Sequence, residues 1–384
     1  AIDNSGDIGD IIGDFIGNYV DGYGGAIENT GMIDSLTGNF IGNYNSRNKQ
    51  TWGGAIHNYY GIINNITGDF IGNYVISTST TTSSFFNGAR GGAIHNDEYG
   101  TIGNITVNFI GNYANGHYAE GGAIYSEGSI GNITGDFIGN YVTGDITRGG
   151  AISSNGAGNL TSNFINNYTL GSQMAYGGAI YGSNVGYEVP SDKILQLPMI
   201  SINISDTGDV YTFYQGIPAD AQEQLDAMLE AGYKVIYINA GEQTMTSAEW
   251  EQMKPELDAM LESGEMATEP QITDDKYLVQ NLGSFINSSF FGNYAKSAEG
   301  EAKGGAIYTM TDLMITADNG NSVFSGNYVE DVNGKRPEAV YVESPTATLT
   351  LRAKNEGTIL FDDQINGTSG YKLKLDGDTT GRVI

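Results

Sequence analysis

Residues 121–148, GGAIYSEGSIGNITGDFIGNYVTGDITR, decide how this chain is expected to fold. The stretch lacks the i, i+3, i+4, i+7 spacing of apolar residues that indicates an amphipathic helix. Apolar and polar residues alternate in short runs instead, and Gly, Asn and Asp separate these runs, which is typical of short strands joined by tight turns. We therefore interpret residues 121–148 as one unit of three short β-strands.

Two motifs of this unit recur along the chain in strict alternation. The motif Gly-Gly-Ala-Ile has its first Gly at Gly24, Gly53, Gly91, Gly121, Gly149, Gly177 and Gly304. The motif Phe-x-x-Asn-Tyr has its Phe at Phe15, Phe40, Phe70, Phe109, Phe137, Phe164, Phe290 and Phe324. A fixed order of strand units indicates a solenoid, in which each unit buries its apolar side chains against the next.

We expect an all-β fold, a right-handed parallel β-helix with about eight regular rungs. Stacking then predicts columns of like residues, with the Ile of each Gly-Gly-Ala-Ile motif and the Phe of the second motif facing inward. Asn can bond its own backbone at a bend, and stacked carboxamides can bond one another. The sequence therefore predicts a structural asparagine ladder of Asn18, Asn43, Asn73, Asn112, Asn140, Asn167, Asn293 and Asn327.

The repeat is interrupted once, so we divide the chain into β-helix repeats (1–186), an insert (187–282) and a β-helix continuation with divergent C-terminal rungs (283–384). The insert holds 5 of the 7 Pro and only 5 of the 56 Gly, and it carries 18 acidic against 4 basic residues. Helical spacing occurs only there, around 221–229 and 250–261, with Thr246 and Glu249 as a predicted capping box. Strands are predicted at 210–214 and 234–239, which together indicate a small acidic α/β domain.

Composition excludes several classes of function. The net charge is −28, which repels nucleic acids and anionic membranes. Cys is absent, so disulfides and thiolate metal sites are ruled out. The sequence has no run of 18 apolar residues, and we expect no direct membrane insertion of this fragment. We expect a monomer without a cofactor. Because Ala1-Ile2-Asp3-Asn4 aligns with the middle of a repeat, we also expect the sequence to be a piece of a longer array.

Gly-Gly-Ala-Ile alternating with Phe-x-x-Asn resembles the passenger repeats of the chlamydial polymorphic outer membrane proteins and of related Gram-negative autotransporters. Residues 357–365 and 370–378 are similar to later passenger rungs, and the resemblance covers about 1–186 and 283–384. It implies a β-helical passenger that is exported by a type V route through the outer membrane. It also implies extracellular display at the bacterial cell surface, often as an adhesin.

Columns of the repeat also suggest three kinds of site. The residues that precede each Gly-Gly include aromatic and Arg side chains, which are enriched in binding surfaces. We therefore predict binding residues at Tyr23, Trp52, Arg90, Arg148 and Tyr176. The residues that follow Ala-Ile include a carboxylate and two exposed imidazoles on consecutive rungs, which are metal ligands in type. The predicted metal set is Glu28, His57 and His95.

The third site rests on the column before each Phe, in which Asp and Asn alternate: Asp14, Asn39, Asp69, Asn108, Asp136 and Asn163. Asp69 and Asp136 lie two rungs apart, about 9.6 Å at the ordinary strand spacing, which is near the separation of an inverting glycosidase pair. The regular repeat of this column favours a solvated turn face over a catalytic pair.

The function we expect is a surface-displayed adhesin or interaction scaffold that binds a host or cell-surface protein or glycan, and not an enzyme. The partner contacts either the insert or the faces of the solenoid. Two alternatives stay open on the same fold. One is a polysaccharide-active hydrolase or lyase, and the other is a structural stalk with no partner of its own.

Overall fold

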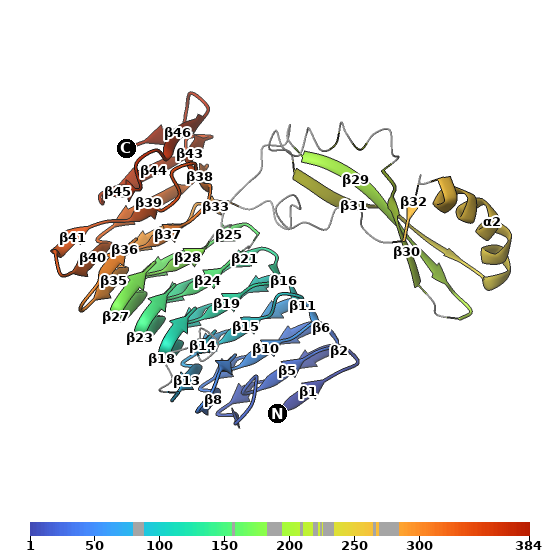
Figure 1. Cartoon of the computed structure of the whole chain (residues 1–384), viewed down its shortest axis with the longest axis horizontal. Helices are drawn as coiled ribbons and strands as arrows, with labels where there is room; N and C mark the ends of the chain where they lie inside the picture. Colours follow the sequence, from blue (N-terminus) through green and yellow to red (C-terminus); the bar gives the residue numbers. More distant parts are fainter. Residues whose placement is uncertain are drawn as a thin grey trace. The chain divides into compact units, whose positions relative to one another are not determined.

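The computed structural model describes residues 1–79, 88–155, 158–182, 194–207, 210–217, 222, 225, 234–263, 266–268 and 284–384. The chain forms two compact units, Ala1–Glu188 with Asn281–Ile384, and Val189–Gln280. The first unit is a parallel β-helix, as predicted (Figure 1). In its described residues, strands of successive rungs pair in parallel, with a register shift between β23 and β27 at Gly144–Ile146, and one hairpin, β40–β41, is antiparallel.

Each regular rung contributes strands to four sheets. Strands of the first sheet carry the Ala-Ile motif: β1 Ile2–Asn4, β5 Ile27–Asn29, β10 Ile56–Asn58, β15 Ile94–Asn96, β19 Ile124–Ser126, β24 Ile152–Ser154, β28 Ile180–Gly182, β37 Ile307–Thr309, β42 Val340–Val342 and β45 Ile365–Gly367. The second sheet follows: β2 Asp7–Ile12, β6 Met32–Thr37, β11 Ile62–Thr67, β16 Thr101–Thr106, β20 Ser129–Ile130, β21 Ile133–Thr134, β25 Leu160–Thr161, β33 Phe285–Ile286, β38 Leu313–Asp318, β43 Thr348–Lys354 and β46 Lys372–Gly377.

The other two sheets lie on either side of the Gly-Asn corner. The third holds the Phe column: β3 Phe15–Ile16, β7 Phe40–Ile41, β12 Phe70–Ile71, β17 Phe109–Ile110, β22 Phe137–Ile138, β26 Asn163–Ile165, β34 Ser289–Phe291, β39 Asn321–Ser325, β44 Thr358–Phe361 and β47 Arg382–Val383. The fourth begins at the Tyr of each motif: β4 Tyr19–Val20, β8 Tyr44–Arg47, β9 Thr51–Trp52, β13 Tyr74–Ser77, β14 Gly88–Arg90, β18 Tyr113–Glu120, β23 Tyr141–Arg148, β27 Tyr168–Tyr176, β35 Tyr294–Ser297, β36 Glu301–Lys303, β40 Tyr328–Asp331 and β41 Gly334–Pro337.

The number of strands per rung differs from the three predicted. A corner separates Phe137–Ile138 from the strand that begins at Tyr141, so each regular rung has four strands. Gly139 at this corner has φ 61°, a left-handed conformation that glycine adopts without strain. The chain turns there, and the Tyr starts a fourth strand.

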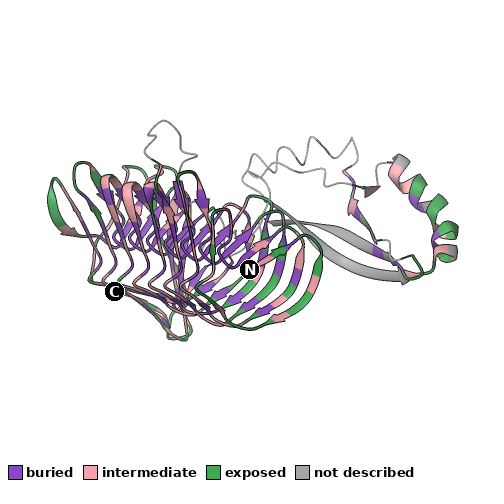
Figure 2. Cartoon of the chain, turned by 90° about the horizontal axis from the view of Figure 1, so that it is seen from below, coloured by how far each residue is buried: buried purple, intermediate pink, exposed green. Residues whose placement is uncertain are grey.

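The core of the β-helix consists of the predicted inward columns. The Ile of each Ala-Ile motif and the Phe of each second motif are buried, except at the first rung, where Ile2 and Phe15 are half-buried. Buried residues recur at the same place on successive rungs (Figure 2). Phe109 and Phe137 stack with their ring centroids 4.8 Å apart, and the Phe rings above and below continue the stack.

Stacked carboxamides run beside the Phe column. Asn112 Nδ2 donates to Asn140 Oδ1 at 2.9 Å and to the carbonyl oxygen of Phe70 at 2.9 Å. The same pattern links Asn43, Asn73, Asn140, Asn167, Asn293 and Asn327, starts at Asn18 and ends on Asp363 Oδ2. A second buried ladder, which we did not predict, joins Asn4, Asn29, Asn58, Asn96 and the hydroxyl of Ser126. The buried carboxamides of these two ladders are therefore paired from rung to rung.

The rungs before and after the insert pair directly with one another. Phe164 of β26 is in register with Phe290 of β34, and Tyr168 of β27 is in register with Tyr294 of β35. Asn167 Nδ2 donates to Asn293 Oδ1 at 3.0 Å, so the asparagine ladder also continues across this junction. The insert thus leaves the stack of rungs uninterrupted.

The second unit contains a sheet in the order β31–β29–β30–β32, with β29 at Ile194–Ile204, β30 at Val210–Gln215, β31 at Lys234–Met245 and β32 at Met266–Ala267. Helix α2 covers Ser247–Ser263 and continues through Pro255. The predicted capping box is present, since the Thr246 backbone N–H donates to Glu249 Oε2 at 2.8 Å. Trp250 and Leu257 pack with Phe213 in a small core. The predicted helix at 221–229 lies almost entirely outside the described residues.

Among the described residues, no helix combines the length and apolar character needed to cross a bilayer.

Candidate binding site

Two columns of side chains lie next to each other at the Gly-Gly corner. We call the residues before each Gly-Gly the corner column: Tyr23, Trp52, Arg90, Glu120, Arg148, Tyr176 and Lys303. We call the residues after each Ala-Ile, with Tyr341 of the final Tyr-bearing rung, the ring column: Asp3, Glu28, His57, His95, Tyr125, Ser153, Tyr181, Tyr308 and Tyr341. The corner is tight because a Cβ on Gly122 would lie 2.1 Å from the carbonyl oxygen of Gly150. This close approach of backbones brings the two columns together.

The two columns interlock diagonally. Trp52 of the corner column stacks on His95 of the next rung, with centroids 4.8 Å apart. The guanidinium carbon of Arg90 lies 4.7 Å from the ring centroid of Tyr125. The same relationship joins Tyr23 to His57, Arg148 to Tyr181, Tyr176 to Tyr308 and Lys303 to Tyr341. Most corner-column side chains therefore cover a ring of the neighbouring rung, by stacking or by a cation–π contact.

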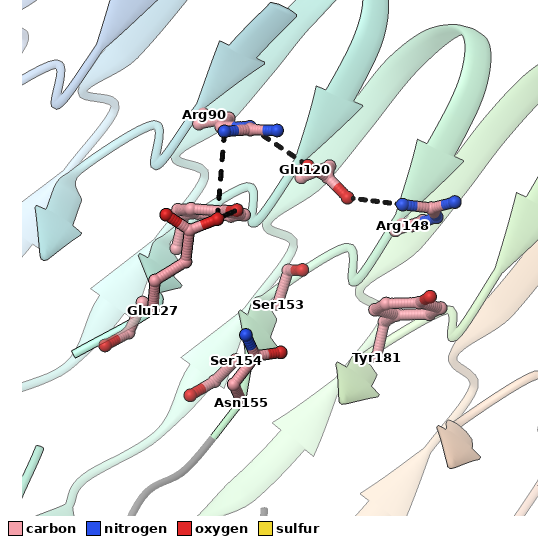
Figure 3. A pocket seen from close by; sticks show the side chains of 10 residues that line it. Arg90, Glu120, Glu127, Arg148, Ser153, Ser154, Asn155 and Tyr181 are labelled. Carbon is pink, nitrogen blue, oxygen red and sulfur yellow. Dashed lines mark hydrogen bonds and ion pairs between the residues drawn. The ribbon is translucent and has the colours of Figure 1, made fainter. Parts of the chain in front are cut away.

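Ser153 interrupts the ring column. The neighbouring rings of the column lie about one rung apart, with His95 and Tyr125 at 5.1 Å and Tyr181 and Tyr308 at 5.2 Å between centroids. At Ser153 no ring fills the space between Tyr125 and Tyr181, and a hollow of about 230 Å³ opens there. Figure 3 shows Ser153, Ser154 and Asn155 between Glu127 and Tyr181. Arg90, Glu120 and Arg148 lie above them in this view.

The charges around the hollow are paired. Arg90 Nε donates to Glu120 Oε2 at 3.0 Å, and Arg148 Nη1 donates to Glu120 Oε1 at 3.0 Å (Figure 3). The Tyr125 hydroxyl donates to Glu127 Oε1 at 2.5 Å, and Glu127 also lies 4.0 Å from Arg90 Nη1. Two cations and two carboxylates leave the hollow close to neutral. Burial raises the pKa values of the Tyr125 and Tyr181 hydroxyls, which therefore stay protonated.

The structure brings two of the five predicted binding residues to this hollow. Arg90 and Arg148 line it, whereas Tyr23, Trp52 and Tyr176 lie farther along the corner column. Sequence reasoning did not single out Glu120, Tyr125 or Tyr181. The sequence does contain a feature that indicates the hollow. Ser153 is small, whereas Tyr125 and Tyr181 occupy the same position on the two neighbouring rungs.

The predicted metal set needs correction on one point. His57 and His95 are not exposed, since each is only 1% exposed. Trp52 and Tyr125 each stack on the His95 ring, and Tyr23 lies against His57 with the ring centroids 5.0 Å apart, which explains the burial. The imidazoles are in register on β10 and β15, and Glu28 Oε1 lies 3.8 Å from His57 Nδ1. The group whose ligand atoms lie within 4.8 Å of one another is His57, His95 and Asp97.

The acidic column before each Phe forms a ladder of its own. Asn108 Nδ2 donates to Asp69 Oδ1 at 3.0 Å, and Asn163 Nδ2 donates to Asp136 Oδ1 at 2.9 Å. The carboxylates also accept the backbone N–H groups of the same Asn residues. Each Asp is therefore engaged with the next rung, a structural arrangement that the alternation of Asp and Asn explains.

A comparison with protein-family models matches residues 287–310 to the Chlamydia polymorphic membrane protein repeat. The matched residues include a Phe-x-x-Asn-Tyr motif and a Gly-Gly-Ala-Ile motif. The chain thus contains a repeat of the polymorphic outer membrane protein type, as the resemblance predicted. This repeat supports a location at the cell surface. Comparisons with curated proteins and with solved structures gave no match.

Proposed function

We propose that this chain is a surface-displayed adhesive protein that binds a glycan at the hollow beside Ser153. The observation that carries the proposal is the missing ring between Tyr125 and Tyr181, because every other position of the ring column from His57 to Tyr341 carries a ring. The rungs on both sides are fixed by the stacked core and by the asparagine ladders, so the hollow is preformed. A preformed site binds with a smaller loss of conformational entropy.

The chemistry of the walls favours a sugar ring. Small-ligand sites fix the orientation of the ligand with a few well-placed polar groups. Tyr125 and Tyr181 border the hollow, its accessible lining is mainly polar, and Ser153 and Asn155 provide hydroxyl and amide groups within it. Arg148 and Glu120 add a donor and an acceptor at the rim. The near-neutral balance of charge suits a hydroxyl-bearing ring better than a strongly charged group.

Surface display is supported by the polymorphic membrane protein repeat at residues 287–310. The β-helix provides a rigid support that keeps the hollow in a fixed conformation at the surface of the chain. Each rung contacts only its neighbours in a solenoid, so a change of one side chain at Ser153 alters the surface there and leaves the rest of the stack unchanged.

The proposal is tested with a glycan array probed by the purified chain, followed by a reducing-sugar release assay on each bound glycan. We expect binding to a limited set of glycans without release of sugar. Release would identify a polysaccharide-active enzyme on this fold. Absence of glycan binding, with or without capture of a protein partner, would overturn the glycan proposal.

Arg148→Gln serves as the matched variant in the same array, because it removes a charged donor and leaves the ring column intact. We expect weaker binding to the same glycans. Lys296→Gln is the control, since this residue pairs with Glu330 on an exposed part of the fourth sheet. Equal loss in both variants would indicate a general charge effect instead of a site at the hollow.

A further inference from the structure

Two buried imidazoles form no hydrogen bond in the described part of the chain. Both ring nitrogens of His57 and both of His95 are buried without a partner. A buried polar group without a partner destabilises the fold, so such groups call for a ligand or another explanation. The remaining histidine of the chain, His117, behaves differently because its Nδ1 pairs with Asp145.

The two imidazoles lie side by side on neighbouring rungs. Their ring centroids are 5.1 Å apart and their planes are inclined by 57°, so the rings are not simply stacked. Asp97 follows the strand that carries His95, and one ligand atom from each of the three residues lies within 4.8 Å of the others. Glu28 of the preceding rung approaches His57 Nδ1 at 3.8 Å from the other direction.

We propose that His57, His95 and Asp97 bind a divalent transition metal ion of the zinc type, while the Glu28 carboxylate lies on the other side of His57 and orients its ring. Imidazole and carboxylate together are a common ligand set for Zn²⁺. A bound ion would give the buried nitrogens a partner. With metal–ligand distances of about 2.0–2.2 Å, the ligand atoms must approach one another more closely than 4.8 Å. Asp97 is only half-buried and can rotate to close this distance.

Filling of the ring column does not explain the two histidines. At the equivalent position of the next rung, Tyr125 directs its hydroxyl to Glu127 and leaves no polar atom unpaired. A Tyr or Phe would fill the space at His57 and His95 without burying two pairs of ring nitrogens. Packing alone therefore does not explain why histidine occupies these two positions, whereas coordination of a metal ion does.

The site is tested by titrating the metal-free chain with Zn²⁺ alone, using isothermal titration calorimetry and the thermal unfolding midpoint. We expect one Zn²⁺ per chain and a higher midpoint in its presence, because a ligand of the native state stabilises it. Trp52 stacks on His95, so Cu²⁺ bound at this site should also quench tryptophan fluorescence. Absence of stoichiometric binding by either ion would overturn the proposal.

Three variants locate the site. His95→Gln and Asp97→Asn should each weaken Zn²⁺ binding on the order of tenfold or more, since even the loss of an outer partner has effects of that size. His117→Gln should bind as the parent chain does. Asp97 is half-buried, so we expect Asp97→Asn to fold. Zn²⁺ binding can therefore still be measured in this variant if His95→Gln fails to fold. Parental affinity in folded Asp97→Asn, or equal loss in His117→Gln, would contradict the assignment.

Discussion

Trp52 stacks on His95 of the next rung with the ring centroids 4.8 Å apart and the planes inclined by only 12°. The relationship is diagonal, because the first residue precedes its Gly-Gly corner and the second follows the corner of the neighbouring rung. It recurs along the solenoid wherever a ring follows Ala-Ile. Ser153 breaks the series, and Glu120, which would otherwise cover a ring there, binds Arg90 and Arg148 instead.

The asparagine ladder predicts a stability effect at a single carboxamide. Asn112 Oδ1 accepts both the backbone N–H and the Nδ2 of Asn73, and its own Nδ2 donates to Asn140. Asn112→Ala leaves these buried groups unpaired and should lower the free energy of unfolding by about 1–3 kcal/mol. Chemical denaturation measures the change. Asn18→Ala at the half-buried first rung is the control and should have a smaller effect.

The Phe stack predicts a larger loss. Phe137 is completely buried and lies 4.8 Å from the ring centroids of both Phe109 and Phe164. Phe137→Ala creates a cavity in the stacked core. The free energy of unfolding should therefore fall by about 3–5 kcal/mol. Ile138→Ala, on the following half-buried residue, serves as the comparison. An unchanged unfolding midpoint in Phe137→Ala would show that the column is not part of the core.

Alkaline pH should destabilise the β-helix through its stacked tyrosines. Burial, with repulsion from neighbouring tyrosines as a smaller cause, raises the pKa values of Tyr113 and Tyr294 to about 12. The ordinary pKa is about 10, so the unfolded chain loses these protons first. The contribution of these two tyrosines to the free energy of unfolding is therefore fully present below pH 10 and is lost as the pH rises toward 12.

Ultraviolet absorbance of tyrosinate, followed together with circular dichroism, measures this loss. The double variant Tyr113→Phe and Tyr294→Phe should show a weaker dependence on pH over the same range. An equally steep loss in this variant would assign the alkaline transition to other groups.

The repeat made the fold predictable because its chemistry is local and periodic. Gly at a left-handed corner, Ile and Phe in inward columns and Asn at a bend each have one favourable position in a rung, as Gly139, Phe137 and Asn140 show. The division into four strands was missed because the Gly-Asn corner lies inside an apparently continuous alternating run. The strand at 194–204 in the insert was also not predicted.

The candidate site was predictable only in part. Arg90 and Arg148 were identified from their column, but the hollow depends on a side chain that is absent at Ser153. A single sequence shows which residues share a column, whereas the diagonal contact between columns depends on the corner geometry. The same contact explains why His57 and His95 are buried, although their place in the repeat suggested exposure.

Removal of the insert should leave the β-helix intact. Phe164 already pairs with Phe290, and Asn167 already donates to Asn293, so the rungs on both sides form a continuous stack. Loop closure depends weakly on loop length, and each rung contacts only its neighbours. A chain in which a short Gly-Asn turn replaces residues 188–281 should keep its β-rich circular dichroism and its glycan binding. Loss of binding in the folded variant would place the binding surface on the insert.

The most direct test of the account is to complete the ring column at the hollow. Ser153→Tyr supplies the ring that Tyr125 and Tyr181 carry on the neighbouring rungs, so the fold should tolerate it while the hollow is filled. Ser153→Ala keeps the hollow open. Asp3→Tyr adds a ring to the same column at the exposed first rung, which controls for a nonspecific effect of one more tyrosine.

Calorimetric titration with a glycan identified on the array compares these three variants with the parent chain. We predict that Ser153→Tyr lowers the affinity on the order of tenfold or more, while Ser153→Ala and Asp3→Tyr bind as the parent chain does. Parental affinity in a correctly folded Ser153→Tyr variant would contradict the claim that this hollow is the binding site.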